Sequence, residues 1–412
     1  MNTAFYSGLS GLSAYSSALN IVGNNLANIN TAGFKFSDVT FEDLVTRTFG
    51  GTATNGAGNP MQTGLGTLPN SISSIFSQGS IMSSAEATNV AMEGSGFFIV
   101  GDTTEDRYYT RAGSFFLNDE GYLVNPDGKY VLGYTQVDAN GNIINSGALY
   151  QISLPGNSLS GPQQSTFFEI YSNLDADAVD GDTYSASTTV YDSLGASHTI
   201  TIDFVYDGPN TEWDYTVSTP NATIAPAAGS ITFNPDGTIA TPAGDITLAM
   251  TAFTNGAADM NVDWRLYDTN GVGILTGYAQ DSTTYSTNSD GYPPGFLTSV
   301  IVDQEGMIQG VFSNGQVEDL AQLAIANFNN PKGLLRTGRN LFTETGASGT
   351  PSIGAANSGG RGTVVGSALE SSNVDIAVEF TKMLVFERGY QANSKIITAS
   401  DTITQTAIGL VR

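Results

Sequence analysis

The two ends of the chain carry large hydrophobic residues at helical spacing. Near the N-terminus these residues recur at alternating intervals of three and four, at Leu12, Tyr15, Leu19, Val22, Leu26 and Ile29. Near the C-terminus they recur every seven residues in two registers, at Ile376, Met383 and Tyr390 and then at Ile396, Ile403 and Leu410. Such spacing places side chains on one face of a helix, and a heptad register is typical of a face that meets another helix. We therefore predict two long terminal helices whose apolar faces form a polymerisation interface.

The first predicted helix begins after a cap at Asn2 or Thr3 and ends near Ile29. Gly33 follows, where a glycine can adopt the left-handed geometry that ends helices. Three glycines inside the helix each cost about 1 kcal/mol relative to alanine, at Gly8, Gly11 and Gly23. We expect this helix to be marginal alone and to become stable when its apolar face is covered.

The last predicted helix has a clear start and continues to the C-terminus. Ser372 with Asp375 three residues later has the spacing of a capping box, and Asn373 is a second possible cap. The hydrophobic seam shifts by one position between Tyr390 and Ile396. A long straight helix with a period near 3.6 produces such a shift.

Between the helices the sequence is typical of short strands and turns. The first such stretch is dense from Gly96 to Tyr134, with turn sequences at residues 118–121 and 125–128. Its strand signals recur every 8 to 12 residues, a spacing that indicates an all-β sandwich or barrel. The composition changes after about Tyr150, and the following stretch contains both tryptophans, which favour a separate core. The first style returns from about Gly291.

The predicted architecture is therefore mainly β with long terminal α-helices and nested, discontinuous domains. The terminal helices form a coiled-coil-like layer, and the two β domains are barrels or sandwiches. We expect a terminal helical domain at 1–33 and 370–412, an extended connector at 34–70 and 355–369, a first β domain at 71–147 and 284–354, and an inserted second β domain at 148–283.

Composition excludes several classes of function. The net charge is −25 with 14 basic residues, and Arg265 is the one cation between Lys129 and Lys332. So few cations cannot neutralise a run of phosphates, so we expect no binding to nucleic acid and none to anionic membrane surfaces. The first 20 residues lack Lys, Arg and a continuous apolar core. We therefore expect neither a cleavable secretory signal nor a membrane-spanning segment.

Candidate chemistry is sparse. The absence of cysteine excludes disulfides and thiolate ligands. The one histidine, His198, lies in an alternating strand pattern, and we expect a partly exposed strand residue there. Residues 359–362 are glycine-rich but lack the Lys-Ser/Thr of a phosphate-binding loop. We predict no catalytic residue and no cofactor.

One acidic cluster has a spacing that resembles a calcium loop. Its members are Asp175, Asp177, Asp180 and Asp182. The spacing is off by one and no bidentate acid follows at the required distance. An acidic turn in a β domain is the better interpretation, and we predict no metal site.

Each end of the chain carries a sequence motif. The N-terminal motif residues are Asn28, Asn30, Thr31, Gly33, Phe34 and Lys35, and the C-terminal ones are Asn373, Asp375, Arg388, Tyr390, Gln391 and Asn393. Together these motifs resemble the bacterial flagellar hook protein family, among the axial rod and hook proteins. Further similarity lies at residues 96–98, 110–115, 190–195 with His198, 313–315 and 330–334. One departure is Gly389, where the family often has a larger residue.

The resemblance implies a structural subunit of the flagellum and no enzyme. Family members are exported unfolded by the flagellar export apparatus and polymerise outside the cell into a curved, flexible, hollow tube, a universal joint that transmits motor torque to the filament. The resemblance implies terminal helices as inner layers and β domains as the outer shell. Implied partners are further copies of the chain and the rod, hook cap and hook–filament junction proteins.

Two other functions remain as alternatives. A distal rod or junction subunit shares the terminal motifs but is much shorter and lacks the second β domain. A secreted β-rich adhesin is a different class, and it should be a stable monomer with ordered ends. An axial subunit should instead be monomeric only with disordered ends. Proteolysis of the monomer therefore separates an adhesin from an axial subunit, because disordered termini are trimmed first.

Overall fold

The fold is seen in a computed structural model that describes residues 3–44, 46–49, 61–102, 106–138, 142–154 and 159–410. The chain forms two compact units. The first consists of Met1–Pro155, Ser299–Gly310 and Glu318–Arg412, and the second of Gly156–Thr298 and Val311–Val317. The described part is mostly β, with one long helix at each end, so the predicted fold class is confirmed. No helix among the described residues is long and apolar enough to cross a membrane.

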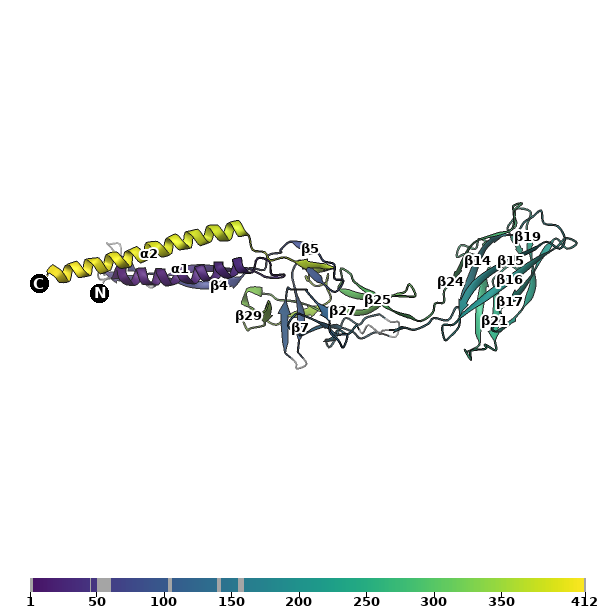
Figure 1. The fold of residues 1–412 in the computed structure, drawn as a ribbon, viewed down its shortest axis with the longest axis horizontal. Helices are drawn as coiled ribbons and strands as arrows, with labels where there is room; N and C mark the ends of the chain where they lie inside the picture. The colour runs from purple at the N-terminus through teal and green to yellow at the C-terminus, as the bar shows by residue number, and fades with distance from the viewer. Residues whose placement is uncertain are drawn as a thin grey trace, which may run out of the picture. The chain divides into compact units, whose positions relative to one another are not determined.

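The two terminal helices belong to the first unit and run antiparallel, side by side (Figure 1). Helix α1 spans Thr3–Ala27 and helix α2 spans Ile376–Leu410. Both predicted helices are therefore present, and α1 ends two residues earlier than the expected Ile29. Gly33 follows in the left-handed region with φ of 68°, as the sequence predicts.

The segment after α1, predicted as an extended connector, instead folds back on the helix as a hairpin. Strand β1 (Ser37–Asp43) pairs antiparallel with β4 (Thr67–Ser74). Strand β2 (Thr46–Phe49) likewise pairs with β3 (Met61–Gly64). The ring of Phe41 lies 5.7 Å from that of Tyr15 on α1. The described strands β1 and β4 cover the helix, a tertiary contact that the Gly, Thr and Asn composition of this segment does not reveal.

Besides the helices, the first unit holds a β domain. Its remaining strands in the N-terminal part are β5 (Ile81–Ser83), β6 (Val90–Glu93), β7 (Phe97–Gly101), β8 (Arg107–Thr110), β9 (Phe116–Leu117), β10 (Leu123–Val124), β11 (Tyr130–Tyr134) and β12 (Tyr150–Gln151). The C-terminal part supplies β28 (Ile325–Asn327), the 3₁₀ turn η1 (Pro331–Gly333), β29 (Leu335–Gly338), β30 (Leu341–Thr343), β31 (Ser352–Gly354), β32 (Thr363–Gly366) and β33 (Ala368–Glu370). Strands β25 (Gly295–Val302), β26 (Met307–Phe312) and β27 (Val317–Leu323) contain residues of both units.

Strand β7 is the centre of this β domain. It pairs with β8, β11 and β28, and all five of its residues are buried. Phe98 and Val100 belong to one hydrophobic cluster, and Phe97 and Ile99 to another on the opposite face. The C-terminal strands β32 and β33 pair with β6 and β5 in two separate two-stranded sheets, so the second predicted connector segment also contains paired strands.

The second unit is a β-sandwich. One sheet contains β14 (Phe167–Asn173), β18 (Thr223–Ala225), β21 (Ile246–Thr251), β22 (Met260–Arg265), β23 (Leu275–Thr276) and β24 (Thr283–Ser289). The other contains β15 (Thr183–Tyr191), β16 (Ser197–Asp207), β17 (Glu212–Ser218), β19 (Ala228–Phe233) and β20 (Ile239–Thr241), and the short β13 (Leu159–Ser160) pairs with β25. One core joins both sheets, with Phe168 and Trp264 from the first and Phe204, Trp213 and Tyr215 from the second.

The boundary of the second unit lies later along the chain than expected. We predicted the inserted domain at 148–283, whereas the second unit begins at Gly156 and its main segment ends at Thr298. Strand β24 begins at Thr283 and pairs along its length with β14, so residues 284–289 belong to the sandwich.

Candidate assembly site

Small residues on α1 form the face that packs most tightly. The residues buried along α1 recur at intervals of three and four and are Gly8, Gly11, Ala14, Ala18, Val22 and Asn25. A Cβ atom added to Gly11 would lie 2.6 Å from Oδ1 of Asn393 on α2. A Cβ atom on Gly8 would lie 3.3 Å from side-chain atoms of Ile396 and Ile397. The glycines that weaken the isolated helix therefore allow its backbone to approach α2 closely.

An aromatic cluster closes the same contact further along the helices. The rings of Tyr15, Phe41 and Phe386 lie 5.7 to 6.1 Å apart from one another. Gly389 lies beside them, and its added Cβ atom would come within 2.7 Å of Cζ of Tyr15. Gly389 is therefore a packing position, which explains why this chain has no larger side chain there.

Replacing Gly389 with leucine should separate the two helices. Overpacking of this kind destabilises by about 1–3 kcal/mol, because Tyr15 must leave its position between the helices. We expect a lower melting temperature of the helical circular-dichroism signal. Gly409→Leu is the matched control in the same helix, because an added Cβ atom there meets nothing within 4 Å. Equal melting of the two variants would show that the helices do not pair closely at this point.

The structure places the predicted seam residues in two different environments. On α1, Val22 is buried, and Leu12, Tyr15, Leu19, Leu26 and Ile29 are half-buried against the rest of the unit. On α2, Met383 is half-buried, but Ile376, Tyr390, Ile396 and Ile403 are 51%, 36%, 44% and 64% exposed. The side chain of Leu410 lies outside the described residues. Of the α2 residues predicted for the seam, Ile396 therefore approaches Gly8 of α1, whereas Ile376 and Ile403 are left largely exposed.

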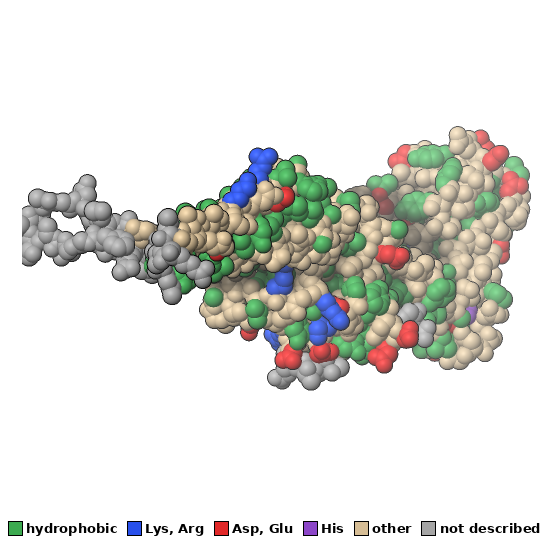
Figure 2. All heavy atoms as spheres, turned by 60° about the vertical axis from the view of Figure 1, so that its left-hand side comes forward, with side chains coloured by type: hydrophobic (Ala, Val, Ile, Leu, Met, Phe, Trp, Pro, Cys, Tyr) green, Lys and Arg blue, Asp and Glu red, His purple; other side chains and the backbone are tan. Residues whose placement is uncertain are grey.

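More hydrophobic surface on α2 was missed by the heptad pattern. Val378, Phe380, Leu384 and Val385 are each exposed by about half of their surface. Figure 2 shows hydrophobic side chains gathered over the helical part of the face in view. Exposed large apolar side chains in this number indicate an interaction site.

A buried ionic cluster joins the segment after α1 to the segment before α2. The Nζ atom of Lys35 donates to Oε1 of Glu370 at 2.6 Å, and both side chains are fully buried. Nη1 of Arg111 lies 3.7 Å from the other carboxylate oxygen of Glu370. Gln78 and the backbone amide of Gly79 also donate to Glu370. This carboxylate therefore holds four chain segments together, and two of them lead directly into the helices.

Burial controls the electrostatics of this cluster. Removal from water lowers the pKa of Lys35 below its ordinary value, although Glu370 opposes the shift. Burial likewise lowers the pKa of Arg111, and Glu370 again acts in the opposite direction. Two buried cations therefore depend on one carboxylate, which makes Glu370 the most sensitive residue of the site. The sequence motif contains Lys35, but nothing in the sequence indicated Glu370 or Arg111 as its partners.

A second polar cluster connects the two helices with β1. Asn25 donates to the buried carboxylate of Glu379 at 3.0 Å and exchanges two hydrogen bonds with the backbone of Ser37. Nζ of Lys382 lies 3.1 Å from carboxylate oxygens of both Asp38 and Glu379. Burial acts to lower the pKa of Lys382, but the two carboxylates outweigh it and raise that pKa. The cluster fixes the position of α2 relative to the hairpin.

The N-terminal motif residues form the chain reversal after α1. The hydroxyl of Thr31 donates to Oδ1 of Asn28, and Nδ2 of Asn28 donates to the carbonyl of Asn24 in α1. The amide of Gly33 donates to the carbonyl of Glu370, and an added Cβ atom would lie 2.5 Å from the backbone nitrogen of Ala112. Phe34 is buried, whereas Asn30 is exposed. The motif therefore brings the chain into the ionic cluster.

The C-terminal motif caps α2 by a different residue than the one expected first. Oδ1 of Asp375 accepts from the amides of Ala377 and Val378, so Asp375 is the N-cap. The prediction of Ser372 as the cap is wrong, because the helix begins at Ile376. The predicted second cap, Asn373, instead bonds the amide of Phe36 and the carbonyl of Ile75. It therefore ties the start of α2 to the hairpin.

The later motif residues lie along α2. Asn393 donates to the carbonyl of Gly389 and faces Gly11, while Gln391 donates to Glu387 on the outer surface. Arg388 is exposed. The motif thus combines one residue of the helix contact with residues on the surface of the unit.

The prediction for His198 is wrong in one respect. The residue is in strand β16 but is buried, with its ring 4.9 Å from that of Phe253 and its Nε2 atom 2.8 Å from Oδ2 of Asp192. Asp192 is also buried and accepts from Asn255 and from the amides of Leu194 and Ala196. The pair closes the turn between β15 and β16, and a carboxylate so fully bonded has a structural role.

The acidic cluster of the second unit is a set of turns. Asp175 accepts from the amide of Asp177, and Asp182 accepts from that of Val179. Asp180 accepts from the amide of Gly208. In the described part of the chain, no group of three or more His, Asp or Glu side chains is placed to hold a metal ion.

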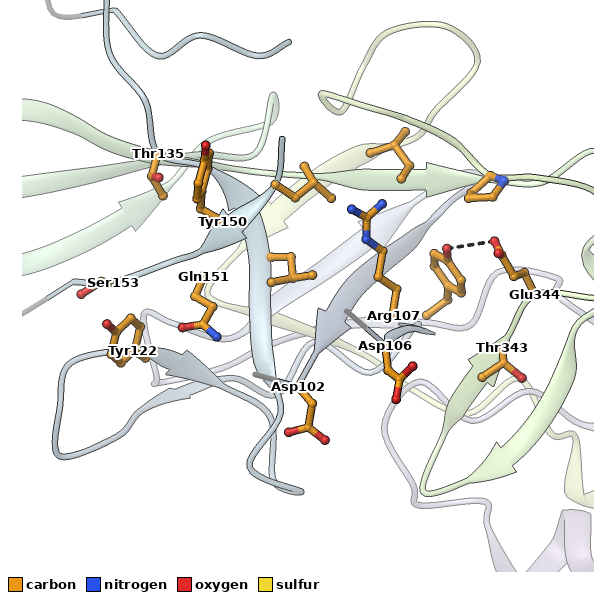
Figure 3. Close-up of a pocket in the computed structure, with 15 residues that line it drawn as sticks. Asp102, Asp106, Arg107, Tyr122, Thr135, Tyr150, Gln151, Ser153, Thr343 and Glu344 are labelled. Carbon is orange, nitrogen blue, oxygen red and sulfur yellow. Dashed lines mark hydrogen bonds between the residues drawn. The ribbon is translucent and has the colours of Figure 1, made fainter. Parts of the chain in front are cut away.

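A cavity of about 1320 Å³ opens in the first β domain (Figure 3). Tyr122 and Tyr150 lie on one side of it, and Arg107 and Glu344 lie on the other. The hydroxyl of Tyr109 donates to Glu344 at 3.3 Å. Burial, and then the charge of Glu344, raise the pKa of Tyr109 to about 12, so this hydroxyl stays protonated at neutral pH. The lining offers hydrogen bonds but no activated nucleophile or base.

Comparison with known proteins first places the chain among the flagellar rod and hook proteins. Four family models match: "Flagella basal body rod protein" at residues 5–35, "Flagellar hook protein FlgE/F/G D1 domain" at 91–160, "Flagellar basal body protein FlaE D2 domain" at 162–292 and "Flagellar basal body rod FlgEFG protein C-terminal" at 365–410. The first and last cover the two terminal helices. The second model lies mainly in the first β domain, and the third lies in the second unit.

Full-length relatives define the family more narrowly. The flagellar hook protein FlgE of Treponema pallidum is 33% identical over 464 residues, which cover 100% of both chains. Those of Escherichia coli and Salmonella typhimurium are 32% and 33% identical, over 99% of this chain and 100% of theirs. The chain therefore belongs to the flagellar hook protein family.

Proposed function

We propose that this chain is the structural subunit of the bacterial flagellar hook. Copies polymerise outside the cell into a curved, flexible, hollow tube that transmits motor torque to the filament as a universal joint. The chain is a structural protein and not an enzyme. Membership of the hook protein family over the full length supports this function and disfavours a distal rod subunit or an adhesin.

One observation carries the assembly mechanism. Helix α2 already contacts α1 along one face, yet Ile376 and Ile403 remain more than half exposed. Burial of apolar surface stabilises by about 25 cal/mol per Å². The exposed residues therefore favour contact with helices of neighbouring copies, in which the predicted interface residues of both helices become covered. Full stability of the two terminal helices would then depend on the neighbouring copies in the polymer.

Flexibility of the tube requires contacts that exchange without large changes in free energy. Strand β24 of the second unit exposes mainly small polar residues, because Thr283, Ser286, Thr287 and Asn288 are exposed there beside one aromatic residue, Tyr285. Neutral polar groups exchange hydrogen bonds with water at little net cost. Such surfaces allow neighbouring subunits to slide, whereas large apolar patches would fix one geometry.

Other partners follow from the place of a hook in the flagellum. We propose that the chain contacts rod proteins at one end of the hook and the hook–filament junction proteins at the other, with the hook cap at the growing tip. The export apparatus delivers the chain unfolded. The absence of cysteine and the glycines inside α1 suit a chain that folds after export.

The substitution Ile403→Asp tests this mechanism. Ile403 is 64% exposed, so we expect the monomer to melt as the wild type does. A carboxylate placed in an apolar interface costs several kcal/mol, so polymerisation should be lost. Sedimentation and electron microscopy of the purified protein measure polymer, and circular dichroism measures folding. Thr402→Asp is the control with the same charge at the neighbouring exposed position. Tubes formed by Ile403→Asp at wild-type concentration would contradict the proposed interface.

A further inference from the structure

A second cavity in the first unit has a basic lining. It measures about 450 Å³ and lies between the end of α1, the end of β8 and the hairpin of β29 and β30. Its charged lining residues are Asp127, Arg336 and Arg339, and the others are neutral, mostly Asn, Thr and Ser. We call it the arginine pocket. Its lining carries one more positive than negative charge, whereas the whole chain has a net charge of −25.

Arg339 has an unusual backbone conformation. With Asn340 it forms the two-residue tip of the hairpin, and the two residues have φ of 52° and 58°. Such a tip favours glycine and asparagine, because their side chains tolerate the left-handed region. Asn340 meets this preference and donates to the carbonyl of Ala32. Arginine does not meet it, and a backbone outlier of this kind indicates a function for the side chain.

The hairpin presents its arginines on a rigid base. Nη2 of Arg336 donates to the carbonyl of Lys35 at 2.6 Å, and its guanidinium lies 4.9 Å from the centre of the Phe34 ring. Nη1 of Arg339 lies 3.0 Å from Oδ1 of Asp127. The side chain of Arg339 is nevertheless 74% exposed, and a guanidinium has five donors. Asp127 therefore orients the guanidinium and leaves donors directed to solvent.

Charge complementarity identifies the occupant. The chain has 39 acidic and 14 basic residues, and Figure 2 shows few Lys and Arg side chains on the face in view. Any second copy of the chain approaches as an anion, and arginine binds carboxylates through paired hydrogen bonds. We propose that the arginine pocket receives an aspartate or glutamate side chain of a second copy. The contact rests on the proposed function and adds to the helix interface.

The symmetry of such a contact fits a helical polymer. A pocket on one copy and a carboxylate elsewhere on the next make a heterologous contact, in which different surfaces meet. Heterologous contacts that do not close into a ring produce open helical assemblies. The pocket also contains the motif residues Asn28 and Phe34, so it lies at the base of the terminal helices.

Three variants of Arg339 test the role of its charge. Arg339→Glu should raise the concentration needed for polymerisation by about tenfold or more, because it repels the incoming carboxylate. Arg339→Gly should raise the melting temperature of the monomer, because glycine fits the turn, and still weaken polymerisation. Arg339→Lys should polymerise at a concentration between those of the wild type and Arg339→Glu. Lys332→Glu is the control, since Lys332 is an exposed cation of the same unit outside the pocket.

Cross-linking identifies the occupant directly. In Arg339→Lys the introduced amine can be coupled to a contacting carboxylate by a carbodiimide, with loss of one water. Polymers are assembled from equal amounts of ¹⁴N and ¹⁵N subunits, coupled, digested and analysed by mass spectrometry. Cross-linked peptide pairs that combine both labels support a second copy. Pairs of a single label, joining the introduced amine to Asp127, would overturn the proposal.

The outcomes separate this inference from the proposed function. If the wild type polymerises and both Arg339→Glu and Arg339→Gly polymerise at the same concentration, the arginine pocket is not a subunit contact, although the helix interface stands. If the wild type forms no polymer, both the proposed function and this inference are wrong.

Discussion

Replacing Glu370 with glutamine should destabilise the first unit by about 3–5 kcal/mol, because it leaves Lys35 and Arg111 as buried cations without a counter-charge. The neutral amide preserves shape, so the loss is electrostatic. The segments that hold α1 and α2 on the β domain should separate first. We therefore expect early loss of the helical signal on heating, and loss of polymerisation.

The second unit is an internal control for this variant. It has its own core and contains both tryptophans, Trp213 and Trp264, so its transition followed by tryptophan fluorescence should not change. Glu344→Gln is a matched substitution in the same unit, because Glu344 is exposed and accepts one long hydrogen bond from Tyr109. A melting temperature of Glu370→Gln equal to that of Glu344→Gln would mean that the ionic cluster does not stabilise the unit.

Replacing Asp192 with alanine should destabilise the second unit and leave the first unchanged. The carboxylate accepts four hydrogen bonds, from His198, Asn255 and two backbone amides. Each buried donor left without a partner costs about 1–3 kcal/mol. We expect a loss of at least about 3 kcal/mol, measured by tryptophan fluorescence during denaturation with urea. Asp214→Ala, an exposed position on β17, is the control.

The same carboxylate should make the stability of the second unit dependent on acid. Burial alone raises the pKa of Asp192, but its hydrogen bonds outweigh burial and hold the pKa below the ordinary value of 3.8. A depressed pKa in the folded state adds stability above pH 3.8, and this stability is lost as the pH falls through the folded pKa. Asp192→Asn should reduce the slope of stability against pH in this range. An unchanged slope would assign the acid sensitivity to other carboxylates.

The terminal helices show how far the hydrophobic pattern reaches. Large residues at helical spacing predicted both helices within a few residues of their ends. They did not predict the face on which the helices meet, because that face on α1 consists of Gly8, Gly11, Ala14 and Ala18. Small residues carry little hydrophobic signal, yet they allow the closest approach of two backbones. Large α2 residues such as Ile376 and Ile403 remain largely exposed and, in the proposed assembly, available to other copies.

The polar residues show a similar limit. The motif around Lys35 was recognised from its sequence, but the partner of that lysine lies 335 residues away, at Glu370. His198 and Asp192 are six residues apart, and even there the alternating pattern predicted exposure rather than a buried pair. Local spacing gives the face of a strand, whereas burial depends on what covers that face.

By itself, the sequence determined the two helices, the β character and nesting of the middle, the exclusion of thiol chemistry and the resemblance to the hook family. These properties depend on local spacing and composition. The tertiary structure decided which helix faces meet, how the supposed connector folds as a hairpin, and which charges are buried together. Those features come from contacts between residues tens to hundreds of positions apart, and the free energy of such contacts is not contained in any local segment.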